Sequence, residues 1–238
     1  MDVLGGRSIT IVGGGRMGSA LIDALTKAGV SVVGPVRRNE PIRGDLVLLT
    51  VPDREIPAAA AGAPLEAMVG HTAGAVTLAA LAPHEAFSFH PLMTASHGRA
   101  IFAGASAAVA GSTPRALEIA RTIARRLSME PLEIPDSQRA AYHAAASIAA
   151  NFLVTLESMA ARVGAGSGLE RRHLLPLARA ALENWGASGP AALTGPIARG
   201  DAEIVRRQRA AVQAVAPELV PAWDAMAAAT AAMTRDTE

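Results

Sequence analysis

The chain has 238 residues, enough for one large domain or two modest ones. Half of these residues are hydrophobic, but only 3 % are aromatic and 18 % charged, so we expect a core of aliphatic side chains. A net charge of +1 and a shortage of aromatic rings exclude nucleic-acid binding, which needs a basic surface and stacking platforms. The absence of cysteine excludes disulfides and fits a reducing cytoplasm, where we expect the protein.

The first half of the chain alternates short apolar runs with alanine-rich segments of helical length. The runs that predict strands are 8–12, 30–33, 46–51, 67–71 and 87–89, with 132–134 as a further candidate. Thr113 followed by Pro114 predicts the start of a helix that extends to about Leu127. Strands that alternate with helices pair in parallel, so the sequence predicts an α/β fold with a doubly wound parallel sheet of the Rossmann type over residues 1–136.

After Pro135 no β-branched run recurs, and helical periodicity continues along the chain. We therefore expect an all-helical C-terminal domain over residues 137–238, which begins with a helix of about 27 residues. The polar side chains in this helix argue against a membrane span. Further helices are expected at 173–185, 201–214 and 217–233. Because an alanine-rich helical surface with few charges prefers burial, we expect a homodimer through this domain.

A glycine-rich motif lies between the first predicted strand and the helix that follows it. It reads Gly-Gly-Gly-Arg-Met-Gly over residues 13–18, and in this setting G-x-G-x-x-G is typical of dinucleotide-binding folds. Gly13 would allow the turn, Gly15 would let a pyrophosphate approach the backbone, and Gly18 would let helix and strand pack closely. A turn without a ligand is the alternative. The residues of this motif that we expect to bind the cofactor are Gly13, Gly15, Arg16, Met17 and Gly18.

The segment after the second predicted strand indicates which dinucleotide is bound. About 20 residues beyond the first glycine, an NAD-binding fold usually has an acidic residue on the ribose hydroxyls. This chain has Gly34 there, followed by Pro35, Val36, Arg37 and Arg38. Two guanidinium groups can pair with a 2′-phosphate, so the sequence predicts NADP(H). The alternative is that both arginines are simply solvated.

Further candidate residues end predicted strands at the carboxyl edge of the sheet, where α/β folds bind ligands. Val51 and Pro52 end the third strand and are expected at the cofactor, while Asp53 either faces the ligand or, as the favoured reading, caps the next helix. His71 ends the fourth strand and is expected at the cofactor, and His90 ends the fifth and is expected at the substrate. Either histidine could instead order its loop. Without zinc-site spacing or clustered carboxylates, we expect no metal.

Three polar residues recur every four positions along the predicted long helix: His143, Ser147 and Asn151. They form one stripe amid alanines, and a bound polar substrate could supply the partners they need. Neighbouring helices or a dimer partner are the alternative. In the loop at 193–201, Thr194 and Arg199 are expected to bind substrate, Arg199 by clamping a carboxylate, while Asp201 is expected to cap the next helix.

Together these stretches resemble a bacterial family of NADP-oxidoreductase-like proteins, in which a Rossmann domain precedes a helical domain of unknown function, numbered 2520. The stretches that carry the resemblance are 13–21, 51–53, 71–74, 90–92, 142–151 and 193–201. More distantly, the layout resembles ketopantoate reductase, pyrroline carboxylate reductase and the 6-phosphogluconate dehydrogenase group. The resemblance implies a reaction class but no substrate.

The sequence departs from the distant relatives at one point. Ketopantoate reductase and the 6-phosphogluconate dehydrogenase group have a catalytic lysine near the start of the second domain, whereas Lys27 is the only lysine of this chain. His143 is then the best-placed proton donor. We expect NADPH-dependent reduction of a small carboxylate-bearing ketone or imine, with a ketopantoate-like 2-oxo acid as the first candidate by analogy. The alternative is a non-catalytic dinucleotide-binding sensor or partner subunit.

Overall fold

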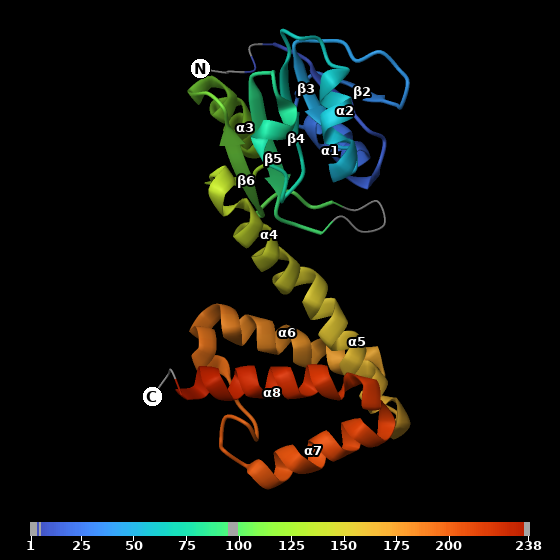
Figure 1. The fold of residues 1–238 in the computed structure, drawn as a ribbon, viewed down its shortest axis with the longest axis vertical. Coiled ribbons are helices and arrows are strands. Elements are labelled where there is room, and N and C mark those ends of the chain that lie inside the picture. Colours follow the sequence, from blue (N-terminus) through green and yellow to red (C-terminus); the bar gives the residue numbers. More distant parts are fainter. Residues whose placement is uncertain (1–3, 5, 95–99, 236–238) are drawn as a thin grey trace. The chain divides into compact units, whose positions relative to one another are not determined.

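The computed structural model describes residues 4, 6–94 and 100–235. The chain divides into two compact units, Met1–Ile148 and Ala149–Glu238. The sequence predicts a domain boundary after residue 136, where a long helical run begins, whereas the division into compact units falls inside that run (Figure 1). The domain boundary therefore stays a prediction.

The first unit is built on a seven-stranded sheet with the order β2-β1-β3-β4-β5-β6-β7. Its strands are β1 (Ile9–Val12), β2 (Val32–Val36), β3 (Leu46–Leu49), β4 (Met68–His71), β5 (Ala86–Pro91), β6 (Ser106–Gly111) and β7 (Glu130–Glu133). Neighbouring strands are parallel, except that β5 and β6 are antiparallel. The predicted α/β fold with a Rossmann-type sheet is confirmed, with this one antiparallel pairing added.

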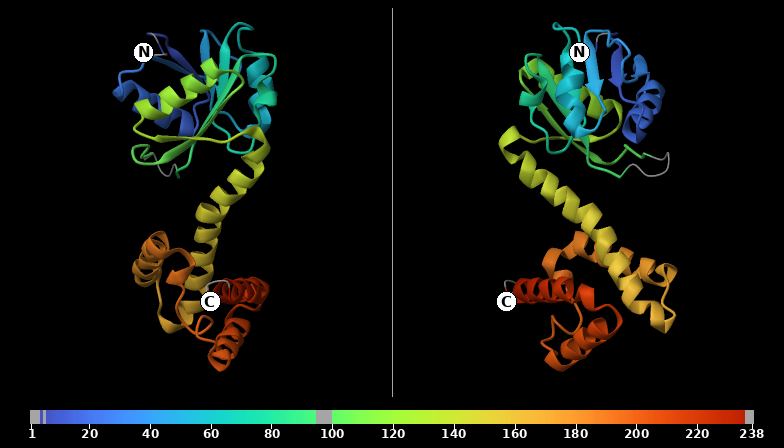
Figure 2. Two further views of the ribbon diagram at one scale, coloured as in Figure 1. Left: turned by 90° about the vertical axis from the view of Figure 1, so that its left-hand side faces the viewer. Right: turned by 45° about the vertical axis from the view of Figure 1, so that its right-hand side comes forward.

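Helices cover both faces of the sheet (Figures 1 and 2). On one face, α1 (Arg16–Lys27) and α3 (Pro114–Arg126) pack in a core with Leu46 and Leu48 of β3. On the other, α2 (Ile56–Ala61) packs in a second core with Val47 and Leu49 of β3. Because successive side chains of a strand point to opposite faces, one run of aliphatic residues serves both cores. The start of α3 is capped as predicted, since the Thr113 hydroxyl accepts a hydrogen bond from the Ala116 backbone N–H at 3.1 Å.

Three local expectations were wrong. No strand was expected at β6, whose sequence is rich in alanine, but pairing on both sides and burial override the helical preference of alanine. The second strand was expected at 30–33 but extends to Val36 through Pro35, which β2 tolerates because it is an edge strand. Asp53 was expected to cap a helix, but it begins the 3₁₀ turn η1 (Asp53–Glu55) and its side chain makes no capping bond.

A continuous helical run extends from Asp136 to Ser167. It comprises the 3₁₀ turn η3 (Asp136–Gln138), α4 (Arg139–Ser147), the π-helical turn η4 (Ile148–Phe152), α5 (Leu153–Gly164) and η5 (Ala165–Ser167). The second unit continues with α6 (Arg171–Ser188), η6 (Gly189–Ala192), α7 (Ala202–Val215), η7 (Pro217–Leu219) and α8 (Val220–Arg235). The expected series of C-terminal helices is thus confirmed.

The same helical run is the one described helix that is long and apolar enough to cross a membrane, with a mean hydropathy of 1.4. Length and composition alone are weak evidence, because core helices of water-soluble proteins pass the same test. At its start, the run carries Arg139, which is buried within the first unit. The expectation of no membrane span rests on such polar residues and stays a prediction.

Candidate functional site

The glycine turn connects β1 to α1 at the carboxyl edge of the sheet. Gly13 has a φ of +109°, and its N–H donates to the Val36 carbonyl at 2.9 Å. The Thr50 hydroxyl donates to the Gly13 carbonyl at 3.0 Å. A Cβ on Gly18 would lie 2.1 Å from that same carbonyl oxygen, whereas a Cβ on Gly15 would meet nothing within 4 Å. Positions 13 and 18 therefore require glycine for the turn itself, and Gly15 borders open space.

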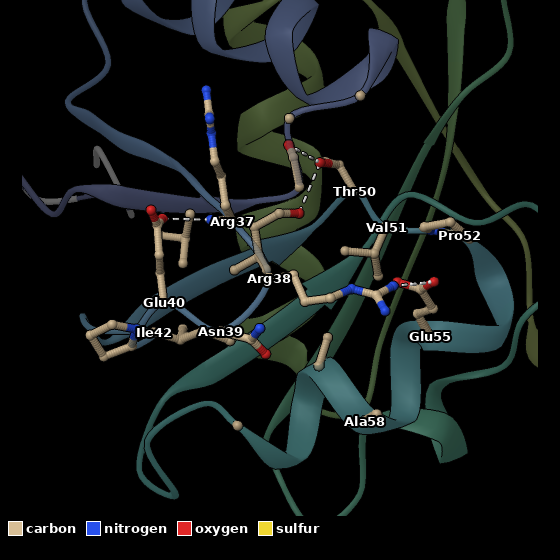
Figure 3. A pocket seen from close by; sticks show the side chains of 18 residues that line it. Arg37, Arg38, Asn39, Glu40, Ile42, Thr50, Val51, Pro52, Glu55 and Ala58 are labelled. Carbon is tan, nitrogen blue, oxygen red and sulfur yellow. Dashed lines mark hydrogen bonds and ion pairs between the residues drawn. The ribbon is translucent and has the colours of Figure 1, made fainter.

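A pocket of about 720 Å³ opens beside this turn (Figure 3). Of the residues predicted to bind the cofactor, those that line the pocket are Gly13, Gly15, Arg37, Arg38, Val51 and Pro52. The predicted residues outside its lining are Arg16, Met17, Gly18 and His71. Met17 packs against the core and Arg16 is exposed. The structure thus brings together the glycine turn, the segment after β2 and the end of β3 around one cavity.

The two arginines after β2 take different directions in this pocket (Figure 3). The Arg38 side chain extends along the pocket, and its Nη2 donates to Glu55 Oε1 at 2.7 Å. The Arg37 side chain diverges from it, while the Arg37 backbone N–H donates to Glu40 Oε2 at 2.7 Å. Sequence reasoning missed both glutamates. The pairing of Glu55 with Arg38 depends on the strand order, in which β2 and β3 lie on either side of β1.

A second group of polar side chains lies where β5 meets α4, and His90, Tyr142 and His143 form what we call the histidine cluster. His90 Nδ1 and the Tyr142 hydroxyl are 2.6 Å apart. The rings of His90 and His143 have their centroids 6.2 Å apart, at an interplanar angle of 73°. A Cβ on Gly74 would lie 2.5 Å from His143 Cδ2, so both histidines close over this glycine. The structure therefore joins two histidines that the sequence predicted separately.

Arg139 binds the carbonyl of Gly74, the glycine next to the histidine cluster, and sequence reasoning missed it. Its side chain is 1 % exposed, and its guanidinium donates to the carbonyls of Ala73 and Gly74, each at 3.2 Å. The guanidinium also donates to Ser88 Oγ and, at 3.2 Å, to Asp136 Oδ1. One signal could have found it, because position 139 precedes His143 by four residues and thus extends the predicted polar stripe by one turn.

Burial sets the protonation states of the groups around the cluster. Burial, helped by the charges of His143 and Arg139, lowers the pKa of His90 from 6.5 to about 4. Burial and the Arg139 charge likewise lower the pKa of His71 to about 4, outweighing the opposite effects of the Thr77 backbone and Asp136. Burial raises the pKa of Tyr142 to about 12. At pH 7, His90 and His71 are neutral and Tyr142 is protonated, so the His90–Tyr142 hydrogen bond joins two uncharged groups.

His71 lies at the end of β4 and is fully buried. Its Nδ1 accepts a hydrogen bond from the Ala73 backbone N–H at 3.2 Å. In the structure it orders the loop after β4, which is the alternative left open by the sequence. Its contact with the cofactor stays a prediction. No group of three or more potential metal ligands occurs in residues 4, 6–94 and 100–235.

The buried His71 predicts acid sensitivity of the fold. Its pKa in the folded chain is about 4, below the ordinary 6.5. At a pH between these two values, the unfolded chain therefore binds more protons than the folded chain does. The free energy of unfolding should therefore fall as the pH drops from 6.5 to 4, by at most about 1.4 kcal/mol per pH unit for this one group. Urea unfolding across this range should show a shallower pH slope in His71→Asn. The exposed His173→Asn is the control, and equal slopes in the two variants would contradict the argument.

The remaining candidates lie in or beside the second unit. Ser147 ends α4, and Asn151 lies in the π-helical turn. Thr194 is exposed, and Arg199 pairs with Asp201, its Nε and Nη2 each lying 3.1 Å from Oδ2. Asp201 is the N-cap residue of α7, as expected, but its carboxylate accepts from Arg199 and makes no capping bond to the helix. The roles of these residues at a substrate stay predictions.

Comparison with known proteins identifies the family. The model of a family described as a domain of unknown function (DUF2520) matches residues 105–230, more than half of the chain, and the chain belongs to this family. None of the curated proteins compared with it is similar in sequence.

Solved structures share the fold along most of the chain. BF3122 from Bacteroides fragilis, which carries a provisional assignment as an NADP oxidoreductase, has a TM-score of 0.81 at 20% identity, covering 94% of this chain and 98% of its own. Protein TM1727 from Thermotoga maritima has a TM-score of 0.77 at 22% identity, covering 96% and 99%. An imine reductase from Streptomyces aurantiacus has a TM-score of 0.68 at 15% identity, covering 97% and 99%. At these identities the likeness establishes the fold.

Proposed function

We propose that this chain binds NADP(H) and reduces a small carboxylate-bearing ketone or imine. The observation that carries the proposal is the pocket lined by both the glycine turn that leads into α1 and Arg38. A helix N-terminus attracts a phosphate, and a guanidinium pairs with a 2′-phosphate. Bound NADPH would supply a hydride. Two proteins that share this fold, the B. fragilis protein and the imine reductase, are described as enzymes of this reaction class.

The pocket residues fit NADP(H) better than NAD(H). Gly15 leaves open space beside the backbone, as a pyrophosphate requires. The two carboxylates in the lining, Glu40 and Glu55, already accept hydrogen bonds from the segment after β2. They are therefore committed to protein donors, whereas NAD-binding folds offer a carboxylate to the ribose hydroxyls.

The histidine cluster supplies the acid–base part of the proposal. Reduction of a carbonyl requires a proton at oxygen as the hydride reaches carbon. We assign this proton to His143, because His90 is neutral at pH 7 and Tyr142 holds its proton to a pKa of about 12. His90 would then orient the substrate by hydrogen bonding, and Ser147 would do so one turn further along α4. Asn151, Thr194 and Arg199 in the second unit are further predicted substrate contacts.

Replacing both Arg37 and Arg38 with serine should weaken NADPH binding. Each charge-assisted hydrogen bond lost is worth about 1.5–3 kcal/mol, before non-additivity. The affinity for NADH should change little, because NADH lacks the 2′-phosphate. Fluorescence titration of the reduced nicotinamide measures both affinities. If the double variant binds NADPH as tightly as the parent chain, the assignment of NADP(H) fails.

We also propose that the chain forms a homodimer through the second unit. Within that unit the buried hydrophobic residues are Val212, Ala216 and Val220. Large apolar side chains remain exposed along its helices, among them Val154 at 67%, Leu177 at 69% and Trp185 at 65%. So much exposed apolar surface indicates an association face, and a second copy of the chain is the partner we propose. Light scattering should give twice the mass of 24.3 kDa, and a monomer at micromolar concentration would contradict the dimer.

A further inference from the structure

The contact between Arg38 and Glu55 connects two segments that line the proposed cofactor pocket. Arg38 follows β2 and Glu55 ends η1, so the ion pair joins the second and third strand ends (Figure 3). The distance from Nη2 to Oε1 is 2.7 Å, and the side chains are 75% and 32% exposed. The pair is therefore well formed but open to solvent, and a ligand in the pocket can reach it.

The other charged groups of the lining do not duplicate this contact. Arg37 diverges from Arg38, and the Glu40 carboxylate is bound to the Arg37 backbone N–H, where it shapes the turn. Two positive and two negative side chains line the pocket, so their charges cancel. Glu55 is thus the acidic group that neutralises Arg38 without holding the backbone of the turn.

We infer that Glu55 is a specificity-determining residue, which holds Arg38 as an internal counterion and gives it up when a 2′-phosphate binds. The inference rests on the proposed function. An exposed ion pair is weak, because water and salt screen it, so a phosphate dianion can take the place of the carboxylate. The exchange still lowers the affinity for the phosphate, since Arg38 must lose one partner to gain another. A ligand without a 2′-phosphate leaves the pair intact and is not affected.

Adenosine 2′,5′-bisphosphate and adenosine 5′-monophosphate are suitable probes, because they differ in the 2′-phosphate alone. Calorimetric titration of the full chain should show that Glu55→Gln binds the bisphosphate about 3- to 10-fold more tightly than the parent. Binding of the monophosphate should change by less than about 2-fold. Glu55→Ala removes the same carboxylate and should give the same gain. Glu66→Gln is the matched control, since Glu66 is exposed and lies outside the pocket lining.

A second pair of variants tests whether Glu55 acts through Arg38. In an Arg38→Gln background, Glu55→Gln should bring no gain for the bisphosphate, because there is no guanidinium left to release. If Glu55→Gln raises the affinity for the bisphosphate just as much in that background, Glu55 repels the phosphate directly, and the inference is overturned. Unchanged affinity in both Glu55 variants would overturn it as well, while leaving the proposed function intact. If the parent chain binds neither the bisphosphate nor NADPH, the proposed function fails, and this inference fails with it.

Discussion

His143→Gln is expected to lower turnover by about 100- to 10,000-fold while leaving the affinity for NADPH nearly unchanged. Glutamine keeps a hydrogen-bond donor but cannot deliver a proton as an acid. His143 lies in the histidine cluster and outside the pocket lined by the glycine turn, so cofactor binding should be spared. Steady-state kinetics and NADPH titration measure the two quantities. His173→Gln, at an exposed position on α6, should leave both unchanged.

A second substitution tests the same site at Gly74, the glycine that the two histidine rings cover. Gly74→Ala would place a Cβ 2.5 Å from His143 Cδ2 and displace that ring. Turnover should fall in this variant too, although His143 is still present. Full activity in a folded His143→Gln variant would move the proton donor elsewhere, with His90 the next residue to test. Loss of folding or of the dimer in that variant would show that the polar stripe is structural.

Arg139→Met is expected to lower the free energy of unfolding of the first unit by about 3–5 kcal/mol. The guanidinium has partners on the loop after β4, on β5 and on η3, and it is almost fully buried. Methionine fills much of the volume but removes the donor to Ser88, to two backbone carbonyls and to one oxygen of Asp136, whose other oxygen still accepts from the Leu78 backbone N–H. Urea unfolding, followed by circular dichroism, measures the loss. Arg139→Lys should recover only part of it, because an ammonium cannot reproduce the planar fork of donors.

Arg121→Met provides the matched control for this substitution. Arg121 forms an ion pair with Glu133 at 2.7 Å, but the side chains are 34% and 54% exposed. An ion pair of this kind is worth about 1 kcal/mol or less. If Arg139→Met costs no more than Arg121→Met, the buried guanidinium does not tie α4 to the sheet in the way described.

Local patterns made part of the fold predictable. The glycine motif predicts the turn between β1 and α1, because a positive φ at Gly13 and a close contact at Gly18 both exclude a side chain. Thr113 and Pro114 predict the start of α3 by the same kind of local chemistry. The sequence did not predict β6, because its alanines favour a helix. Pairing with β5 and β7 makes this segment a strand.

The candidate site was predictable residue by residue but not as a set of contacts. The sequence places His90 at a strand end and His143 on a helix, yet their meeting depends on the packing of α4 beside β5. Arg139 was missed because an arginine in an alanine-rich helix is usually solvated, whereas here the loop after β4 supplies carbonyl partners. No local pattern in the sequence indicates such long-range partners.

The measurement that tests the central proposal most directly is NADPH oxidation by the purified chain with a panel of 2-oxo acids and cyclic imino acids. Loss of the absorbance of reduced nicotinamide reports turnover directly. We expect steady, saturable oxidation with at least one member of the panel, faster with NADPH than with NADH. Saturable binding of NADPH without turnover of any member would contradict the assignment as a reductase and favour a non-catalytic dinucleotide-binding protein.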